Sequence, residues 1–240
     1  MNKENEIRSA GKLITLHLLP GFVLGIVYLL ILKLRILAGL PKIVTVSLAG
    51  SLSILPIELG YLLYVARKEE GSFNIFKILG LKSKMRLWEY IVYTLSLFIL
   101  AGILMTVLKP LTNYIANTVF YWIPSWYNYV EDLSQFDRNA IIITILVNFF
   151  FMTLAGPITE ELYFRGYLLA RMKWMGKYSV LLNVILFSVY HFWSPWLIIA
   201  RIAVMLPLYY CVYKKDSLKL AIIVHCLVNF TDVVSLLSLI

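Results

Sequence analysis

Three clusters that carry polar groups lie inside stretches of this sequence that are otherwise apolar enough to be buried in lipid. Because ionisable groups inside a bilayer are expensive, a functional site is the default explanation for them. The clusters are Glu160-Glu161 with Arg165, Phe187 with His191, and His225 with Asn229. Carboxylate, imidazole and carboxamide groups together can activate a water molecule and stabilise an oxyanion. We therefore predict a peptide-bond hydrolase that works within the membrane.

The first cluster follows a proline at the end of an apolar stretch. We expect Pro157 to lie in the first turn of a new helix, with Thr159 capping its free amides. Glu161 and Arg165 are four residues apart, so they share a helix face and can pair. Glu160 is rotated by about 100° from Glu161, and we expect it to face a cavity and act as a general base. The alternative interpretation is an amphipathic helix whose charges lie among lipid headgroups.

The other two clusters each place a histidine on a defined helix face. Phe187 and His191 are four residues apart in one apolar stretch, and His225 and Asn229 are four apart in another. A single histidine or asparagine can instead serve as a hydrogen bond between membrane helices. Since both histidines follow the glutamate pair in separate apolar stretches, we assign them to one site. His17 has no such partner and is left out of it.

The sequence lacks the residues that other hydrolase mechanisms require. The sequence has no His-Glu-x-x-His zinc motif. Ser188 and Ser194 lie near His191, but neither is in a Gly-x-Ser-x-Gly turn. An aspartyl mechanism needs two aspartates within the membrane, and Asp232 is the one aspartate well inside an apolar stretch. A glutamate-centred mechanism remains.

Three further charged residues lie inside apolar stretches: Glu58, Arg201 and Asp232. Each needs a partner or a wet cavity. We expect structural ion pairs, in which Arg201 joins one of the two acids. Asp232 lies three residues after Asn229, so it shares that helix face and can orient the amide.

The elements that must position these residues are membrane-spanning helices. The chain has 240 residues, of which 61% are hydrophobic and 15% charged, and its mean hydropathy is +0.82. A soluble domain has about 45–50% apolar and about 25% charged residues, so the apolar excess must face lipid. The net charge of +9 lies mostly in short segments between apolar runs, and we expect no nucleic-acid partner.

Seven apolar stretches are long enough to span, since a spanning helix needs about 17–25 residues. They lie near residues 14–34, 43–66, 89–108, 140–158, 178–194, 196–213 and 218–239. We predict an all-α fold, a polytopic transmembrane helical bundle of about seven spans. Residues 109–139, which are rich in Tyr and Trp, could hold an eighth, short or re-entrant helix. Residues 1–240 are expected to form a single integral membrane domain, with a motif-bearing core at about 140–235.

The distribution of Lys and Arg predicts the orientation. These residues concentrate in the N-terminal segment and in residues 67–86, 165–177 and 214–219. All four regions fall on one side if seven helices alternate, and the positive-inside rule places that side in the cytosol. The N-terminus is then inside and the C-terminus outside. The 33–42 connection, with three basic residues, does not fit this pattern.

In chain order the motifs are Glu-Glu-x-x-x-Arg, Phe-x-x-x-His and His-x-x-x-Asn. This set resembles the CAAX prenyl endopeptidase type II family, also called the CPBP or Abi (abortive-infection, bacteriocin-processing) family, over roughly residues 140–235. Each motif alone is weak, but three in order on separate apolar helices are specific. The positions that match without substitution are Glu160, Glu161, Arg165, Phe187, His191, His225 and Asn229.

The resemblance implies an intramembrane protease of many helices with a cavity open toward the cytosol. Glu160 and His191 would activate water. His225 and Asn229 would bind the oxyanion of the tetrahedral intermediate, and such donors are typically worth about 3–4 kcal/mol each. The residues that would support the site structurally are Glu161, Arg165 and Phe187.

The residues allow two interpretations of metal dependence. Members of the family are often labelled metalloproteases, and Glu160, His191 and His225 form a donor set that would suit zinc. Using Glu160 as a ligand leaves no base except Glu161, which the spacing pairs with Arg165. We therefore expect a glutamate mechanism with no required cofactor, and one divalent metal, zinc, at those three residues is the alternative.

We predict an endopeptidase that cleaves near the C-terminus of a lipid-modified or hydrophobic peptide. The expected partners are a hydrophobic or prenylated peptide or protein and membrane lipid. Short loops resemble prokaryotic members of the family, so we expect a prokaryotic plasma membrane. The alternative is a non-catalytic membrane scaffold or bacteriocin-immunity protein that uses the same cavity for binding. A proton-coupled carrier is disfavoured, since two similar halves with broken helices are not visible.

Overall fold

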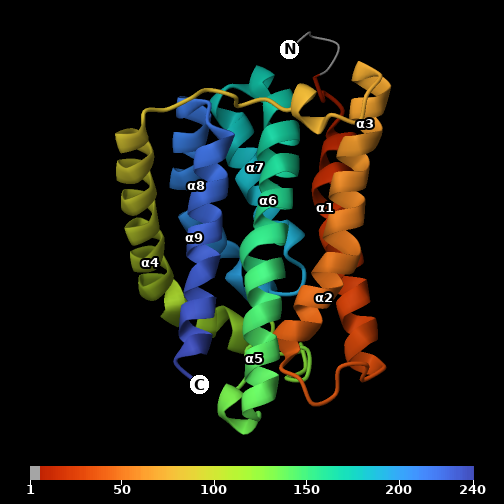
Figure 1. Cartoon of the computed structure of the whole chain (residues 1–240), viewed down its shortest axis with the longest axis vertical. Coiled ribbons are helices and arrows are strands. Elements are labelled where there is room, and N and C mark those ends of the chain that lie inside the picture. Colours follow the sequence, from red (N-terminus) through yellow and green to blue (C-terminus); the bar gives the residue numbers. More distant parts are fainter. Residues whose placement is uncertain (1–5) are drawn as a thin grey trace.

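The computed structural model describes residues 6–240, which form a helical bundle without any strand (Figure 1). Six helical stretches in this part of the chain are long and apolar enough to cross a membrane, and α7 (Lys177–Tyr190) is apolar but shorter. These seven helical regions coincide with the seven predicted spans, so the all-α polytopic bundle is confirmed. The six stretches are α1 (Ala10–Lys33), the α2–α3 helix (Lys42–Glu70), α4 (Leu87–Thr118), the α5–α6 helix (Arg138–Leu169), α8 with its preceding turn (Pro195–Lys215) and α9 (Leu218–Leu237).

The helix that carries both glutamates is continuous, so the prediction that a new helix starts at Pro157 was wrong. Its parts are α5 (Arg138–Val147), a π-helical segment (Asn148–Ala155), α6 (Gly156–Glu160) and a second π-helical segment (Glu161–Leu169). A proline lacks an amide hydrogen and normally breaks the ladder of hydrogen bonds. The preceding π-helical turns, with their i→i+5 bonds, reposition the freed carbonyl groups so that the helix continues. Thr159 is buried, and no side chain caps α6.

A third π-helical segment interrupts the helix that carries Glu58. α2 (Lys42–Ile54) passes through Leu55–Leu59 into α3 (Gly60–Glu70) without leaving the helical path. Glu58 lies within this turn and is fully buried. The turn therefore directs a carboxylate from α2–α3 into the centre of the bundle.

α7 ends inside the bundle, four residues before the predicted end of its span. Its 14 residues rise about 21 Å, which is less than the hydrocarbon thickness of about 30 Å. The chain leaves the helix at His191, with φ −79° and ψ 59°. After a 3₁₀ turn at Pro195–Leu197 it returns as α8 (Ile198–Lys215), and Figure 1 shows this connection at mid-height of the bundle. His191 therefore lies on a connection within the membrane rather than on a helix face.

A close contact between α1 and the end of α7 fixes where that connection begins. A Cβ atom at Gly21 would overlap with the carbonyl oxygen of Tyr190. Only glycine permits this approach. The fully buried Tyr190 is thereby held against α1, directly before His191.

Residues 109–139 contain no separate eighth helix. α4 continues to Thr118, and a 3₁₀ turn at Leu133–Gln135 is the regular structure that follows before α5. The aromatic residues of this stretch therefore belong to the end of α4 and to a loop.

The basic connections meet at one end of the bundle. Figure 1 shows the segment between α3 and α4 crossing the end at which α8 passes into α9. Hydrogen bonds join them, since Ser83 N donates to Asp216 O at 2.8 Å and Leu218 N donates to Leu81 O at 2.9 Å. The C-terminus lies at the opposite end (Figure 1). This arrangement agrees with seven alternating helices, and the side that faces the cytosol stays a prediction.

Candidate active site

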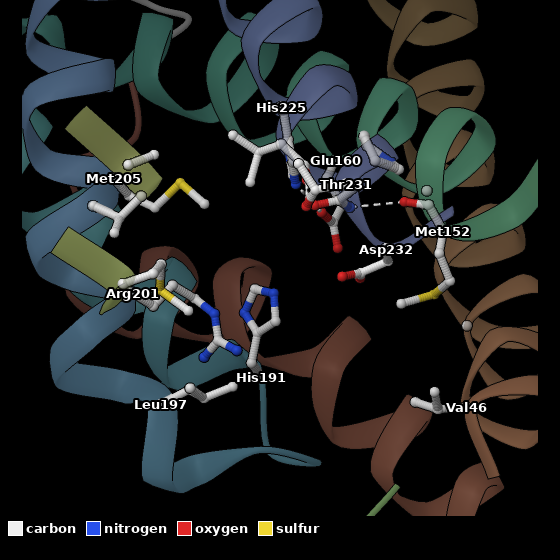
Figure 2. Close-up of a pocket in the computed structure, with 18 of the residues that line it drawn as sticks. Val46, Met152, Glu160, His191, Leu197, Arg201, Met205, His225, Thr231 and Asp232 are labelled. Carbon is white, nitrogen blue, oxygen red and sulfur yellow. Dashed lines mark hydrogen bonds and ion pairs between the residues drawn. The ribbon is translucent and has the colours of Figure 1, made fainter. Parts of the chain in front are cut away.

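A cavity of about 840 Å³ lies within the bundle. It is lined by α2, α4, α6, α8, α9 and the connection after α7. The four residues that were predicted to be catalytic all line it: Glu160, His191, His225 and Asn229. Figure 2 shows the side chains of Glu160 and His225 close together on one wall and His191 projecting from another. Three segments far apart in the sequence thus contribute to one space at membrane depth.

Glu160 presents its carboxylate to this cavity while contacting two aromatic side chains. Its Oε1 accepts a hydrogen bond from the Tyr190 hydroxyl at 3.1 Å. Its Oε2 lies 3.8 Å from His225 Nε2. The side chain is buried from the outside of the bundle. Glu160 is therefore held in place by neighbours but keeps a face toward the space in which a substrate would lie.

His191 is oriented by the helix that it terminates. Its Nδ1 lies 2.7 Å from the carbonyl oxygen of Phe187. A carbonyl only accepts, so Nδ1 carries the hydrogen and Nε2 is left as an acceptor for a molecule in the cavity. The Phe187 ring meets the His191 ring edge to face, with centroids 4.8 Å apart. The four-residue spacing thus orients His191 partly through a hydrogen bond to the backbone of Phe187.

Glu161 lies behind Glu160 and organises the wall of the site. One of its oxygens accepts from the Tyr209 hydroxyl at 2.6 Å and from His225 Nδ1 at 2.8 Å. The same oxygen lies 3.5 Å from Nη1 of Arg165, and both members of this ion pair are fully buried. The pair has the i,i+4 geometry expected from the sequence. The hydrogen bond to His225 was not expected, and it turns Nε2 of that ring toward Glu160 and the cavity.

Arg165 is held mainly by aromatic faces. The centre of its guanidinium group lies 3.4 Å from the centroid of the Tyr209 ring and 3.9 Å from that of Phe187. Within residues 6–240 none of its three side-chain nitrogens has a hydrogen-bond partner. A desolvated cation between two ring faces gains about 2 kcal/mol or more from such contacts. Phe187 therefore supports the site by packing on Arg165 as well as on His191.

Asn229 is fixed by the π-helical segment opposite it. Its Nδ2 donates to the carbonyl oxygen of Met152 at 2.7 Å, a contact drawn in Figure 2. An amide NH₂ has two hydrogens, so one remains for a group in the cavity. Thr153 Oγ1 also donates to the backbone oxygen of Asn229 at 3.5 Å. The π-helical segment of the α5–α6 helix thus orients a side chain of α9.

Two tyrosines that contact the glutamates of the site, Tyr190 and Tyr209, were not recognised from the sequence. The Tyr190 hydroxyl lies between two carboxylates, 3.1 Å from Glu160 and 3.3 Å from Glu58. One hydroxyl hydrogen can be donated to only one of them at a time. The Oε2 atom of Glu58 has no partner within the described residues. The sequence marked Glu58 as an unusual intramembrane charge, but Tyr190 and Tyr209 carried no signal among the 16 tyrosines.

The structural ion pairs expected for Glu58, Arg201 and Asp232 are not formed within residues 6–240. Glu58 contacts Tyr190 instead. Arg201 donates to the Ser194 hydroxyl at 2.9 Å and to the Ser188 carbonyl oxygen at 3.4 Å. Asp232 lines the cavity together with Arg201. The expectation was wrong because position along a helix does not say which side of the cavity each charge reaches.

His17, which was left out of the predicted site, has a structural role. It is fully buried, and its Nδ1 donates to the Leu13 carbonyl oxygen at 2.8 Å. Its Nε2 accepts from Asn183 Nδ2 at 3.0 Å. The ring therefore joins α1 to α7.

The alternative zinc site does not have its ligands in place. Within residues 6–240 no group of three or more His, Cys, Asp or Glu side chains is arranged to hold a metal ion. Glu160 and His225 approach each other at 3.8 Å, but His191 does not complete a set of three with them.

Comparison with known proteins finds a family similarity within the second half of the chain. Residues 142–231 match the family model described as Type II CAAX prenyl endopeptidase Rce1-like. No curated protein and no solved structure matched the chain. The matched segment contains all of the motif residues, from Glu160 to Asn229, and confirms the resemblance drawn from them. The chain is thus an integral membrane protein whose residues 142–231 are similar to the Rce1-like type II CAAX prenyl endopeptidases.

Proposed function

We propose that this protein is an intramembrane endopeptidase that hydrolyses a peptide bond near the C-terminus of a lipid-modified or hydrophobic peptide. The observation that carries the proposal is the shared cavity of Glu160, His191, His225 and Asn229. A carboxylate, two imidazoles and an amide would have no reason to meet at membrane depth in a merely structural bundle. The Rce1-like match over the same residues supports the same class of reaction.

In the proposed reaction Glu160 and His191 act on one water molecule. Glu160 accepts a proton from the water, whose oxygen adds to the carbonyl carbon of the substrate. His191 accepts a hydrogen bond from the same water at its Nε2, since its Nδ1 is occupied by Phe187. The proton taken by Glu160 then passes to the departing amine as the C–N bond breaks. Two cleavage products and a regenerated carboxylate result.

His225 and Asn229 would stabilise the oxyanion that forms when water adds. Asn229 has one amide hydrogen left after its bond to Met152. Because His225 donates through Nδ1 to Glu161, a second N–H at Nε2 requires the doubly protonated ring, and Glu161 supplies the opposite charge. Donors fixed in advance in a site shielded from water are worth about 3–4 kcal/mol each. This role is supported by the hydrogen bonds to Glu161 and Met152, which fix the side chains of His225 and Asn229 before substrate binds.

A hydrophobic or prenylated substrate is supported by the walls of the cavity along α4. Ile99, Ile103 and Val107 line the cavity and are 58%, 54% and 67% exposed at the same time. Side chains that face both the cavity and the surrounding lipid indicate an opening on that side. An apolar chain or prenyl group could then enter from the bilayer without crossing water.

The test is to incubate the purified protein in detergent with a library of farnesylated and unmodified hydrophobic peptides in ¹⁸O-labelled water. Mass spectrometry should find shortened peptides whose new carboxyl group carries ¹⁸O, which locates the bond that was hydrolysed. A non-catalytic scaffold or immunity protein would bind peptides and release them intact. Intact peptides throughout the library would contradict the proposal.

A further inference from the structure

Arg201 is a cation of the cavity wall that forms no ion pair with an acid in the described part of the chain. It lies in the first turn of α8 and lines the cavity. Its two hydrogen bonds go to neutral groups, the Ser194 hydroxyl and the Ser188 carbonyl. Within residues 6–240 no carboxylate lies within ion-pair distance of it.

Two buried arginines of the bundle differ in this respect from Arg201, which is half-buried. Arg165 is paired with Glu161 and lies between two aromatic rings. Arg171 is paired with Glu69 at 2.8 Å. Within residues 6–240, Arg201 therefore lacks the anion that the other two sites contain. A cation at membrane depth is expensive without such a counter-charge.

The acids of the cavity are directed elsewhere. Glu160 contacts Tyr190 and His225. Figure 2 shows the guanidinium group of Arg201 near His191, with the carboxylate of Asp232 beyond that ring. Arg201 donates hydrogen bonds to Ser188 and Ser194, which lie on either side of His191 in the chain. These bonds fix its guanidinium group next to the segment that carries His191. The missing anion is therefore expected from a molecule that enters the cavity.

A carboxylate is the anion that fits. The planar guanidinium fork matches the two oxygens of a carboxylate, and such bonds are stronger than those between neutral groups. A peptide of apolar residues has one anion whatever its side chains, namely its C-terminal carboxylate. We propose that Arg201 binds the free C-terminal carboxylate of the substrate.

This inference rests on the proposed function and adds a substrate rule to it. Because Arg201 and His191 line the same cavity, the bond that is hydrolysed lies only a few residues before the C-terminus. The apolar residues between the two points occupy the cavity, and the carboxylate sets the register. A substrate without a free C-terminal carboxylate should bind poorly whatever its sequence.

The experiment compares one peptide in two forms. A farnesyl-cysteine peptide with three aliphatic residues after the cysteine is prepared as the free acid and as the C-terminal amide. Wild-type protein in detergent should cleave the acid about 10- to 100-fold more efficiently than the amide, mainly through KM, which is the range for a hydrogen bond to a charged group. Arg201→Gln should cleave both forms alike, at the rate of the amide with wild type.

Two further variants test whether the effect belongs to the charge of Arg201. Arg201→Lys should keep part of the preference, since it keeps the cation but loses the fork. Asp232→Asn, which removes a charge of the same cavity, should keep the preference for the acid. Equal cleavage of acid and amide by wild type, or an acid preference that persists in Arg201→Gln, would overturn the inference.

Failure of the proposed function is detected separately. Binding of the acid and the amide is measured on Glu160→Gln and on Glu160→Gln with Arg201→Gln, so that the readout does not depend on cleavage. Tighter binding of the acid that is lost with Arg201 supports the carboxylate site even in a protein that cleaves neither peptide. Equal binding of the two forms to Glu160→Gln contradicts the site whether or not the wild type is an enzyme.

Discussion

The substitution Glu161→Gln removes one negative charge while almost keeping the size of the side chain. Glu161 is fully buried, and a single oxygen of it accepts two hydrogen bonds and lies 3.5 Å from Arg165 Nη1. Arg165 is fully buried as well, and its nitrogens have no hydrogen-bond partner within residues 6–240. Without Glu161 the contacts that favour its charge are mainly those with the aromatic rings of Phe187 and Tyr209.

The size of the effect follows from this geometry. Removing one partner of a buried ion pair costs about 3–5 kcal/mol because the other charge remains. For a chain of this length each kcal/mol shifts the unfolding temperature by about 2–4 °C, so we expect Glu161→Gln to unfold about 6–20 °C lower than wild type. Glu89→Gln is the matched control. It removes the partner of Lys215 at the surface, where ion pairs contribute little.

A double variant separates stability from activity. Glu161→Gln combined with Arg165→Met removes the whole ion pair, and replacing a buried pair by apolar groups is often neutral. Thermal unfolding in detergent should therefore recover most of the loss, whereas cleavage should stay low because His225 lacks its carboxylate partner. An unchanged unfolding temperature for Glu161→Gln, or a double variant no more stable than the single one, would refute the reasoning.

Three further outcomes are expected. Tyr190→Phe leaves Glu160 without the hydroxyl that holds it, so the cleavage rate should fall about tenfold; a wild-type rate would contradict this role. Gly21→Val should lower the unfolding temperature because its Cβ meets the backbone of α7. Gly25→Val, whose Cβ would have an ordinary contact at 3.7 Å, should lower it less. Equal losses in the two variants would contradict a stabilising role for the close contact at Gly21. A chelator should leave cleavage of peptides unchanged, and loss of cleavage that zinc restores would establish a metal-dependent reaction.

The helical fold could be predicted from the sequence because it depends on the lengths of apolar runs. The features of the fold that were not predicted depend on backbone geometry. Pro157 predicted a break, but the π-helical segment before it keeps the helix continuous. The apolar run continues beyond Tyr190, yet α7 ends there, because a connection inside the bundle can be apolar too. Hydropathy does not distinguish these cases.

Only part of the candidate site could be predicted from the sequence, because spacing is informative within one helix. Spacing along one helix correctly indicated that Glu161 and Arg165 can pair, since both positions belong to a single element. Contacts between helices could not be read in this way. The bond from His225 to Glu161 joins α9 to the glutamate helix, and the Tyr190 hydroxyl joins two carboxylates from different helices. Such contacts depend on how the helices pack, and one sequence does not contain that information.

The role of Glu160 as the base that activates water is tested most directly by Glu160→Gln. Peptide binding and peptide cleavage are measured on the same detergent-purified preparation, next to wild type. Binding should be retained while cleavage falls about 10²–10⁴-fold, the contribution typical of a positioned general base. Cleavage by Glu160→Gln at the wild-type rate, with binding intact, would contradict the account.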